Sequence, residues 1–311
     1  MDWYWHLIIS IFAIILILFT VLYFVFKSVF TLKGGLLDIL YDGSPYMPYK
    51  DFITKGQAFF KDCPHEEVNV KSHDNLNLTG LLFTGREKKK FVLHFHGYKA
   101  SYLIDFTSAK SYYDKGYSCL AVNQRAHGDS DGKYITFGVK ERHDVVSWVN
   151  FLVDKFGHDI EIVLGGVSMG AATIMMASNL DISKYVKGII CDSGFVSPKQ
   201  ELTYCLKHDY HLPSFPFIPI INLYCKIFAK FSLDEVSCDK CLSESNIPIL
   251  MVHSTGDSFV PYISSEINFG ACKMENKEFF SIETNLHGGG YLVNREEYEM
   301  KVDKFFKSIN F

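Results

Sequence analysis

The hydrophobic pattern of the chain begins with one unbroken apolar run near the N-terminus. Between Leu7 and Phe26 there are twenty residues without a charge, and only Ser10 and Thr20 interrupt the apolar side chains. As a helix, a run of this length would extend about 30 Å, which is the thickness of the hydrocarbon core of a bilayer. The pattern therefore predicts a single membrane-spanning helix, with Trp and Tyr residues near its ends as interfacial anchors.

The flanks of this run distinguish a retained anchor from a cleaved secretory signal. A secretory signal has a basic leading segment, an apolar run of about 7–15 residues and a small-residue cleavage site. Here the segment Met1–His6 lacks Lys and Arg, the apolar run is longer, and no such cleavage site follows, so we predict a retained anchor. The positive charges follow the helix, at Lys27, Lys33, Lys50 and Lys55, so the positive-inside tendency predicts a cytoplasmic location for the rest of the chain.

Behind the anchor, short apolar runs alternate with amphipathic segments. The segments 67–70 and 76–83 are predicted to pair as antiparallel strands around a turn-prone cluster at 73–75, whereas 34–61 has little periodicity. Further strands and helices then alternate, in the order Phe91–Phe95 (strand), Ser101–Lys115 (helix), Ser118–Asn123 (strand), Val139–Phe156 (helix), Ile160–Leu164 (strand), Met169–Asn179 (helix) and Val186–Cys191 (strand). Such alternation is typical of parallel strands covered by helices on both faces, with the site outside the carboxyl ends of the strands.

Composition excludes some functional classes. The net charge of −4 and the pI near 6.3 give no support for nucleic-acid binding. Eight cysteines are scattered through a large domain instead of forming a disulfide framework, which agrees with a cytoplasmic location. Cys238 and Cys241 are close in sequence, but no second pair at zinc-binding spacing accompanies them, so we interpret the pair as incidental.

The segment Gly166–Gly170, with the sequence GVSMG, lies between the apolar run Ile160–Leu164 and the small residues of Ala171–Ala177. This order predicts a strand, a tight turn and a helix, which would present the hydroxyl of Ser168 outward at the top of a sheet. The flanking glycines are needed because a Cβ atom there would clash with the neighbouring strand and helix. The pattern favours Ser168 as a nucleophile, although a structural glycine turn would have the same sequence.

Two further candidates follow in loops after predicted strands. Asp257 comes after the apolar run Ile249–His253, and His287 comes after Glu278–Ile282. A serine, an acid and a histidine in this chain order are one arrangement of the Ser-His-Asp triad. Asp192, at the end of another predicted strand, is an alternative acid, although the setting of Asp257 favours Asp257.

Four motifs stand in a defined order along the chain: HFHGY at 94–98, NQRAHGDS at 123–130, GVSMG at 166–170 and HSTGDSFVP at 253–261. Together they resemble the α/β-hydrolase superfamily, and within it the serine-hydrolase branch that is similar to serine aminopeptidases and monoacylglycerol lipases. The resemblance covers roughly Val68–Ile309 and implies an α/β-hydrolase fold, in which a mostly parallel sheet carries helices on both faces. Asn123 replaces the usual aspartate of this family, at a position that supports the loop rather than the chemistry.

The resemblance also implies a role for each candidate. Ser168 would attack an acyl carbonyl, His287 would take up its proton, and Asp257 would orient the imidazole. The oxyanion that develops needs fixed N–H donors about 3 Å away. The backbone N–H of Met169 at a helix start is one candidate, and the resemblance implies the backbone N–H of Tyr98 as the second. The identity of the Tyr98 side chain is expected to matter less.

Several histidines have simpler interpretations. His94 and His96 would point to the same face of a strand, as a metal pair requires, but we favour support of the oxyanion loop by His96. His127 is interpreted as a loop-packing residue and His253 as a satisfied core histidine. Neither a cofactor nor a metal is implied.

Between Phe195 and Asn246 the alternation gives way to Pro, aromatic and aliphatic residues, which predicts a small helical cap at about 196–246. We thus expect an anchor with its flank at 1–33, a connecting segment at 34–66 and an α/β-hydrolase domain at 67–311. An apolar cap over the triad favours lipid-like or acylated substrates, and packing against the core is the alternative role of its apolar residues. The predicted activity is hydrolysis of carboxylic ester or thioester bonds by a membrane-anchored esterase or lipase, with peptide hydrolysis and non-catalytic binding as alternatives.

Overall fold

The computed structural model describes residues 3–32, 38–102 and 107–311. Its helices, including a 3-10 helix (η1) and a π-helix (η2), are α1 (Trp3–Phe30), η1 (Met47–Tyr49), α2 (Lys50–Asp62), α4 (Thr107–Asp114), α5 (Glu141–Phe156), α6 (Met169–Ala177), α7 (Pro198–His208), α8 (Phe217–Tyr224), η2 (Cys225–Ala229), α9 (Cys238–Glu244), α10 (Ile263–Ala271), α11 (Gly290–Val293) and α12 (Arg295–Ser308). Its strands are β1 (Glu66–Lys71), β2 (Asn77–Phe83), β3 (Glu87–Phe95), β4 (Tyr117–Val122), β5 (Glu161–Val167), β6 (Val186–Asp192), β7 (Ile249–Ser254) and β8 (Lys277–Ile282).

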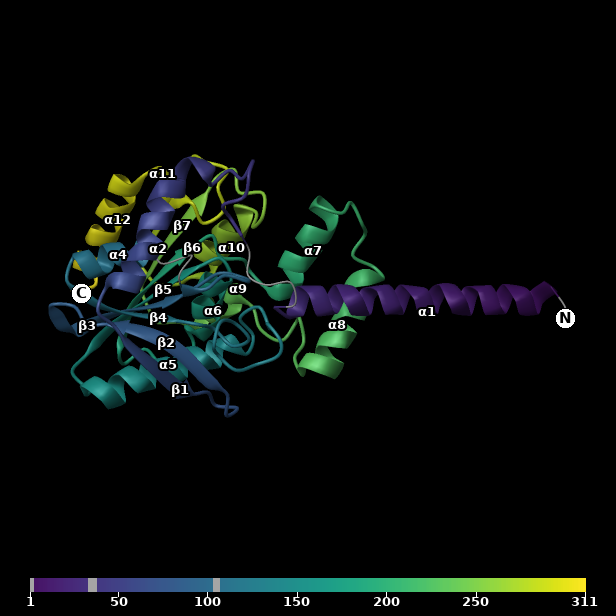
Figure 1. Ribbon diagram of the computed structural model, residues 1–311, viewed down its shortest axis with the longest axis horizontal. Helices are drawn as coiled ribbons and strands as arrows, with labels where there is room; N and C mark the ends of the chain where they lie inside the picture. The colour runs from purple at the N-terminus through teal and green to yellow at the C-terminus, as the bar shows by residue number, and fades with distance from the viewer. Residues whose placement is uncertain (1–2, 33–37, 103–106) are drawn as a thin grey trace.

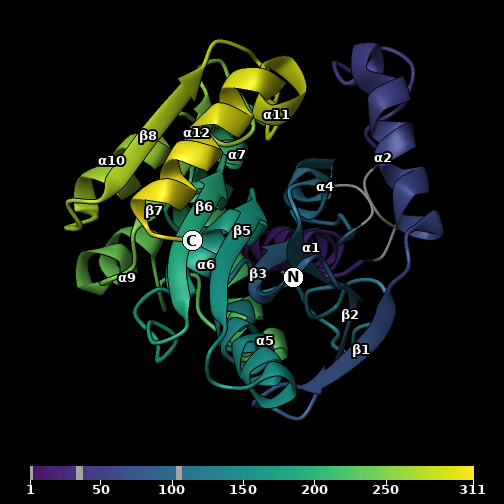
Figure 2. The ribbon, with the colours of Figure 1, turned by 90° about the vertical axis from the view of Figure 1, so that its left-hand side faces the viewer.

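The strands form one eight-stranded sheet in the order β1-β2-β4-β3-β5-β6-β7-β8. β1 pairs with β2 and β2 with β4 in antiparallel fashion, and every pairing from β4 to β8 is parallel. This arrangement confirms the predicted antiparallel pair at the start and the parallel alternation after it. In Figure 2, α4, α11 and α12 lie on one side of the sheet, and α5, α6 and α9 lie on the other.

The two faces of the sheet bury two separate hydrophobic clusters, because neighbouring strand residues point to opposite sides. Leu93 and Leu164 face the cluster that includes Trp148 of α5, whereas Val92 and Val163 face the cluster that includes Phe305 of α12. Both faces are therefore covered, which explains why the central strands are continuous apolar runs in the sequence. The predicted α/β-hydrolase fold class is confirmed.

Some helices were not foreseen from the sequence, among them α10 and α12 after the cap interval and α2 before the sheet. α2 lies within the predicted connecting segment, where Thr54 and Gly56 lower the intrinsic helix propensity. Ile53 of this helix is buried and Phe52 and Phe59 pack against the core, so tertiary packing outweighs propensity. The predicted helix Ser101–Lys115 is described only in part, as α4, because residues 103–106 lie outside the described residues. The predicted boundary at 33 and 34 lies outside them as well.

The N-terminal helix α1 is long and apolar enough to cross a membrane, by length and composition. Its N-terminal half projects from the domain and is exposed, as Figure 1 shows. Its C-terminal half packs on the protein through Leu18, Leu22, Phe26 and Phe30, a spacing of four residues that places them on one helix face. The N-terminal half of α1 therefore projects from the domain, whereas its C-terminal half is packed as part of the fold.

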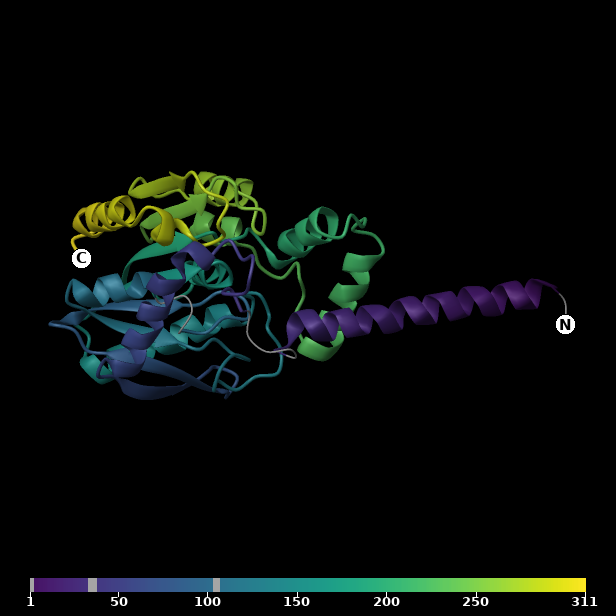
Figure 3. The ribbon, with the colours of Figure 1, turned by 45° about the horizontal axis from the view of Figure 1, so that its top comes forward.

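The helices α7 and α8 lie beyond the end of the sheet, beside the C-terminal half of α1 (Figures 1 and 3). α8 packs beside α1, where the hydroxyl of Tyr224 donates to the carbonyl of Phe19 at 2.7 Å. α9, which also belongs to the sequence interval of the predicted cap, instead packs against α6 and α10 in the helical layer of the domain. The elements beside α1 thus come from residues 198–229.

Candidate active site

Ser168 lies on a strained turn between β5 and α6. Its φ of 55° and ψ of −117° are rare for a residue with a side chain, and such strain persists only where the surroundings enforce it. A Cβ on Gly170 would lie 2.0 Å from the carbonyl oxygen of Phe95, and one on Gly166 would lie 2.6 Å from the backbone of Gly170. Both glycines are therefore required by close backbone approach, as the sequence predicted.

Asp257 and His287 meet although thirty residues separate them in the chain. Nδ1 of His287 lies 2.7 Å from Oδ2 of Asp257, while Oδ1 of Asp257 accepts the backbone N–H groups of Phe259 and Val260. Burial alone would raise the pKa of Asp257, but hydrogen bonds from His253 and His287 outweigh it and hold this pKa well below its usual value. The carboxylate is therefore ionised and fixed against the imidazole.

The same pair sets the basicity of His287. Burial alone would lower the pKa of His287, but the hydrogen bond and the charge of Asp257 raise it above its ordinary value. The second ring nitrogen, Nε2, is buried and has no hydrogen-bond partner among the described residues. The imidazole thus keeps one nitrogen free, next to a cavity that Ser168 also lines.

His253 is a contact of Asp257 that the sequence analysis missed. Its Nε2 lies 3.3 Å from Oδ2 of Asp257 and 3.0 Å from the carbonyl of Val260, while its Nδ1 lies 2.6 Å from the hydroxyl of Ser265. The residue is fully buried and satisfied, as predicted for a core histidine. The sequence signal for this contact was the position of His253 near the end of β7, four residues before Asp257.

The alternative acid Asp192 has a different environment. Its Oδ1 accepts the hydroxyl of Ser193, and the Ser193 hydroxyl in turn accepts the N–H of Gly288, next to His287. Burial raises the pKa of Asp192 to about 6. Of the two carboxylates, Asp257 is the one within hydrogen-bonding distance of the imidazole.

A cavity of about 470 Å³ joins several of the predicted site residues, whereas Asp257 lies behind His287 and is not among its lining residues. Ser168, His287, Asp192 and the loop Gly97–Tyr98 all line it, and Met169 follows Ser168 at the buried start of α6. The opposite wall comes from the segment before α2, including Ile39, Tyr41, Ser44, Pro45 and Tyr46, together with Ile53 of α2. The sequence predicts only a connecting segment here. Its clustered Tyr and Pro residues were the one sign of a packed wall.

The loop that carries Tyr98 is supported from below by two histidines. Nε2 of His96 accepts the N–H of Gln124 at 3.1 Å, so its Nδ1 carries the proton and donates to the Gly97 carbonyl at 2.8 Å. Nε2 of His127 accepts the N–H of Lys99 at 3.2 Å. Burial holds the pKa of His96 well below its usual value. Burial lowers the pKa of His127 as well, so both rings are neutral supports of the loop. The sequence favoured this role for His96, whereas His127 was expected only to pack within its own loop.

One group among the described residues has the geometry of a metal site, and it is occupied by a cation of the protein itself. Ligand atoms of His73, Asp74 and Asp144 lie within 4.8 Å of one another. The guanidinium of Arg125 bonds to Asp74 at 2.8 Å and to Asp144 at 2.6 Å. These carboxylates therefore neutralise a buried arginine, and the group is an ion-pair network.

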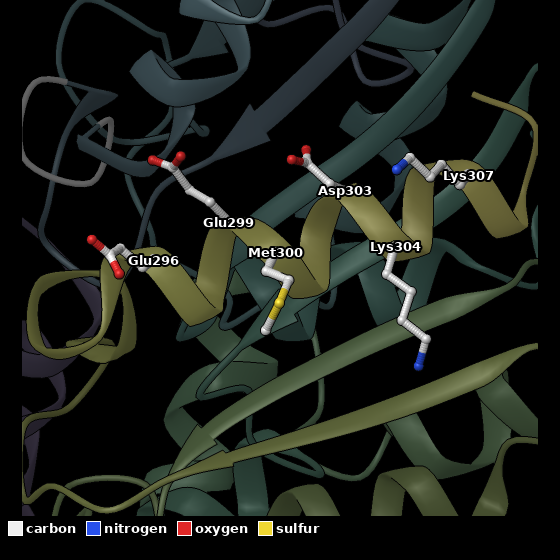
Figure 4. A pocket seen from close by; sticks show the side chains of 6 residues that line it. All are labelled: Glu296, Glu299, Met300, Asp303, Lys304 and Lys307. Carbon is white, nitrogen blue, oxygen red and sulfur yellow. The ribbon is translucent and has the colours of Figure 1, made fainter.

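A second hollow, of about 490 Å³, lies on the outer face of α12. Figure 4 shows its lining side chains arranged along this one helix, namely Glu296, Glu299, Met300, Asp303, Lys304 and Lys307. Exposed charges of both signs on a helix surface are common and contribute little. None of the predicted site residues lies there.

Comparison with known proteins gives the same fold. A family model described as serine aminopeptidase, S33, matches residues 86–231. The uncharacterized protein YqkD of Bacillus subtilis (strain 168) is 29% identical over 215 residues, which cover 69% of this chain and 70% of that protein. The Pyrococcus furiosus esterase Pf2001 is similar in structure, with a TM-score of 0.65, 22% identity, and coverage of 88% of this chain and 97% of that chain. A membrane phospholipase A, described as a bacterial virulence factor, has a TM-score of 0.58 and 16% identity over 86% of this chain and 93% of that chain.

Proposed function

Because the chain has an α/β-hydrolase fold and its residues 86–231 match the family model described as serine aminopeptidase, S33, we propose that it is a membrane-tethered serine hydrolase that cleaves carboxylic ester or thioester bonds of lipid-like or acylated substrates. The environment of His287 carries this proposal. Its Nδ1 is bonded to Asp257, its Nε2 has no partner among the described residues, and it lines one cavity with Ser168. A general base needs such a free nitrogen beside its nucleophile.

The proposed mechanism follows from these positions. His287 accepts the proton of Ser168 as the hydroxyl attacks the acyl carbonyl, and Asp257 stabilises the imidazolium that forms. The backbone N–H groups of Tyr98 and Met169 stabilise the oxyanion, and the start of α6 adds the favourable end of the helix dipole. His287 then protonates the leaving group. Water then attacks the carbonyl of the acyl-enzyme while His287 accepts a proton from it. His287 returns this proton to the oxygen of Ser168, and the carboxylic acid is released.

Membrane attachment rests on the two-part character of α1. All side chains from Trp3 to Ile17 are exposed, although most are large and apolar. Val21, Phe24 and Val25 are also exposed, on the side of α1 that does not pack on the domain. An apolar surface of this extent on a projecting helix needs a lipid environment. We therefore propose a single-pass anchor at 1–33, a connecting segment at 34–66 and a hydrolase domain at 67–311.

The elements beside α1 support an apolar substrate. Tyr224 of α8 contacts Phe19, and the ring of Phe228 lies 5.4 Å from that of Tyr23, so these elements reach the level of the apolar run. At this level they expose large apolar side chains, namely Tyr210, Leu212, Phe215, Leu223, Ile227 and Phe228. We propose that this surface enters the interfacial region of the bilayer, where lipid-like esters are concentrated.

The serine chemistry is tested with a fluorophosphonate probe, which reacts with activated serines. The full-length protein in detergent should be labelled, and Ser168→Ala should abolish the labelling. Loss of the nucleophile should also reduce hydrolysis of p-nitrophenyl butyrate to background. Failure of the wild-type protein to react would support the alternative of a non-catalytic binding protein.

The substrate class is tested by a chain-length series of p-nitrophenyl esters. If the cavity that Ser168 lines accommodates an acyl chain, octanoate should be cleaved with a higher kcat/KM than acetate. Burial of each additional methylene contributes about 0.8 kcal/mol at most, so the rise should continue over several carbons. A flat or inverse series would contradict a lipid-like substrate.

Peptide hydrolysis is a second candidate, since the matching family model is described by a serine aminopeptidase. It would use the same acyl transfer at Ser168 with an amine as leaving group. Aminoacyl p-nitroanilides distinguish the two, because an esterase should cleave them far more slowly than matched p-nitrophenyl esters.

The proposed cytoplasmic side of the catalytic domain rests on Lys27, Lys33, Lys50 and Lys55 following the apolar run. A C-terminal tag on the full chain should be digested by protease added to intact inverted vesicles and protected in right-side-out vesicles. The reverse pattern would place the domain on the opposite side.

A further inference from the structure

The last turn of α1 has an unusual set of partners. An α-helix leaves its last four carbonyl groups without partners inside the helix. Here the carbonyl of Lys27 accepts the hydroxyl of Thr31 at 2.7 Å, and that of Phe30 accepts the N–H of Ile135 at 2.9 Å. The two carbonyls between them, of Ser28 and Val29, both accept hydrogen bonds from one short loop of the catalytic domain.

That loop is the one that contains the proposed oxyanion donor. The hydroxyl of Tyr98 donates to the carbonyl of Val29 at 2.7 Å, and the ammonium of Lys99 donates to the carbonyl of Ser28 at 2.8 Å. A cation at the C-terminal end of a helix is also favoured by the helix dipole. Two consecutive side chains thus attach the loop to the end of the anchor.

The loop needs such attachment because its backbone is strained. Lys99 has a φ of 49°, a conformation that is uncommon for residues with a side chain. The histidines described above hold the loop from the side of the sheet, at Gly97 and at the N–H of Lys99. The side chain of Tyr98 is held on the other side, by Val29 and by stacking at 5.1 Å on Phe137. The backbone N–H of Tyr98 lies between these two supports.

We infer that the last turn of the membrane anchor is a structural part of the oxyanion hole, and that the Tyr98 hydroxyl is a positioning group that acts through its hydrogen bond to Val29. The inference rests on the proposed function, since it concerns the same oxyanion hole. It assigns to the Tyr98 side chain a role that the sequence analysis did not expect. It also means that the seating of α1 affects turnover as well as location.

The test compares Tyr98 and Tyr224, whose hydroxyls each donate a hydrogen bond to a backbone carbonyl of α1. Tyr98→Phe removes the bond to Val29, and Tyr224→Phe removes the bond to Phe19, both of 2.7 Å. Only the first bond belongs to the oxyanion loop. Removal of an oxyanion donor typically lowers turnover by about 10²–10³-fold, and a displaced donor should lose part of this. For full-length Tyr98→Phe in phosphatidylcholine vesicles we expect about a tenfold lower kcat on p-nitrophenyl butyrate, with KM within about twofold.

A second measurement separates positioning from general damage. A trifluoromethyl ketone forms a tetrahedral adduct with an active serine, and the adduct oxygen occupies the oxyanion hole. Its inhibition constant should rise in Tyr98→Phe by the same factor as kcat falls, whereas Tyr224→Phe should keep both values within about twofold of wild type. The midpoint temperature of thermal unfolding should fall by a similar amount in both variants. If Tyr98→Phe does not fold, Lys99→Met, which removes the bond to Ser28, should lower kcat with unchanged KM.

Three outcomes would overturn the inference: an unchanged kcat in Tyr98→Phe, an equal loss in Tyr224→Phe, or a rise in KM alone. The last outcome would mean that the Tyr98 hydroxyl contacts substrate. These results differ from failure of the proposed function, in which the wild-type protein itself would neither hydrolyse esters nor react with the fluorophosphonate probe.

Discussion

The two ring nitrogens of His287 have different environments, and this difference predicts a pH dependence. Asp257 binds Nδ1 and raises the pKa of the imidazole above the ordinary 6.5, against the effect of burial. Protonated His287 has no lone pair to accept the proton of Ser168. Activity should therefore be lost as the pH falls through this raised pKa, so that the acidic limb of kcat/KM lies above 6.5.

Asp257→Asn should change both the rate and this limb. Without the carboxylate the imidazole loses its orientation and its stabilised charge, so kcat on p-nitrophenyl butyrate should fall about 10⁴-fold. The acidic limb of the residual activity should move to lower pH, because the group that raises the pKa of His287 is gone. A pH series of kcat/KM for the wild type and the variant measures both effects.

Asp192→Asn is the matched control, since Asn keeps an oxygen to accept the hydroxyl of Ser193. It should lose far less activity and move the acidic limb less than Asp257→Asn does, because Asp192 raises the pKa of His287 through its charge alone, without a hydrogen bond. If Asp192→Asn proved the more damaging change, the acid of the triad would have to be reassigned to Asp192.

For single residues, the sequence indicated which side chains lie near one another at the candidate site better than it indicated their hydrogen-bond partners. Ser168, Asp257 and His287 were predicted to lie together because each follows an apolar strand, and parallel strands end at one edge of a sheet. The contact of His287 with Asp257 and the cavity that His287 shares with Ser168 agree with this proximity. The contact of His253 with Asp257 and that of the Tyr46 hydroxyl with the His287 carbonyl were not found. Single hydrogen bonds between distant segments leave no periodic trace in a sequence.

Among the elements, the turn between β5 and α6 tolerates the least change. Gly170 lies where α6 passes the end of β3, and an added Cβ would meet backbone atoms, which are unable to rotate away. We expect Gly170→Ala to lower the free energy of unfolding by about 3 kcal/mol, the upper end for overpacking. Urea unfolding followed by circular dichroism measures the change.

Gly270→Ala is a control of the same kind, since Gly270 lies on α10 and an added Cβ there meets nothing within 4 Å. It should be neutral or stabilise by up to about 1 kcal/mol, because alanine favours helix. A similarly small effect of both substitutions would mean that the close approach of α6 and β3 relaxes easily.

The elements themselves divide into two groups. The strands and α5 were predictable, because an apolar strand or an amphipathic helix shows its period in the sequence. α6, whose residues are all buried, was predicted from the glycine turn before it and from its small residues. α2 was not, since its buried face consists of few residues on a stretch with low helix propensity. The packing of α1 on α8 was not predictable either, because two apolar helices carry no signal for each other beyond hydrophobicity.

For the whole molecule, the apolar surface beside α1 predicts a difference between dispersed and membrane-bound substrates. Leu223→Asp combined with Ile227→Asp places two charges on this exposed surface. Charges are costly within the apolar part of a bilayer, so α8 and η2 should withdraw from it. Hydrolysis of a long-chain ester embedded in vesicles should fall at least fivefold, while hydrolysis of soluble p-nitrophenyl acetate should stay within about twofold.

Met300→Asp provides the comparison, because Met300 is an exposed apolar residue on α12, at the far end of the domain from α1 (Figures 1 and 4). It should leave both activities unchanged. Equal losses on soluble and embedded substrates in the double variant would point to damage of the fold instead of loss of lipid contact.

The wall of the cavity formed by residues before α2 affects how the protein should be produced. A recombinant fragment that starts at Glu66 would retain every strand and all three residues of the proposed triad. It would nevertheless lack one side of the cavity, and it would lack Tyr46, whose hydroxyl donates to the carbonyl of His287. A weak or indiscriminate fragment would therefore say little about the natural substrate, and screening should use the intact chain.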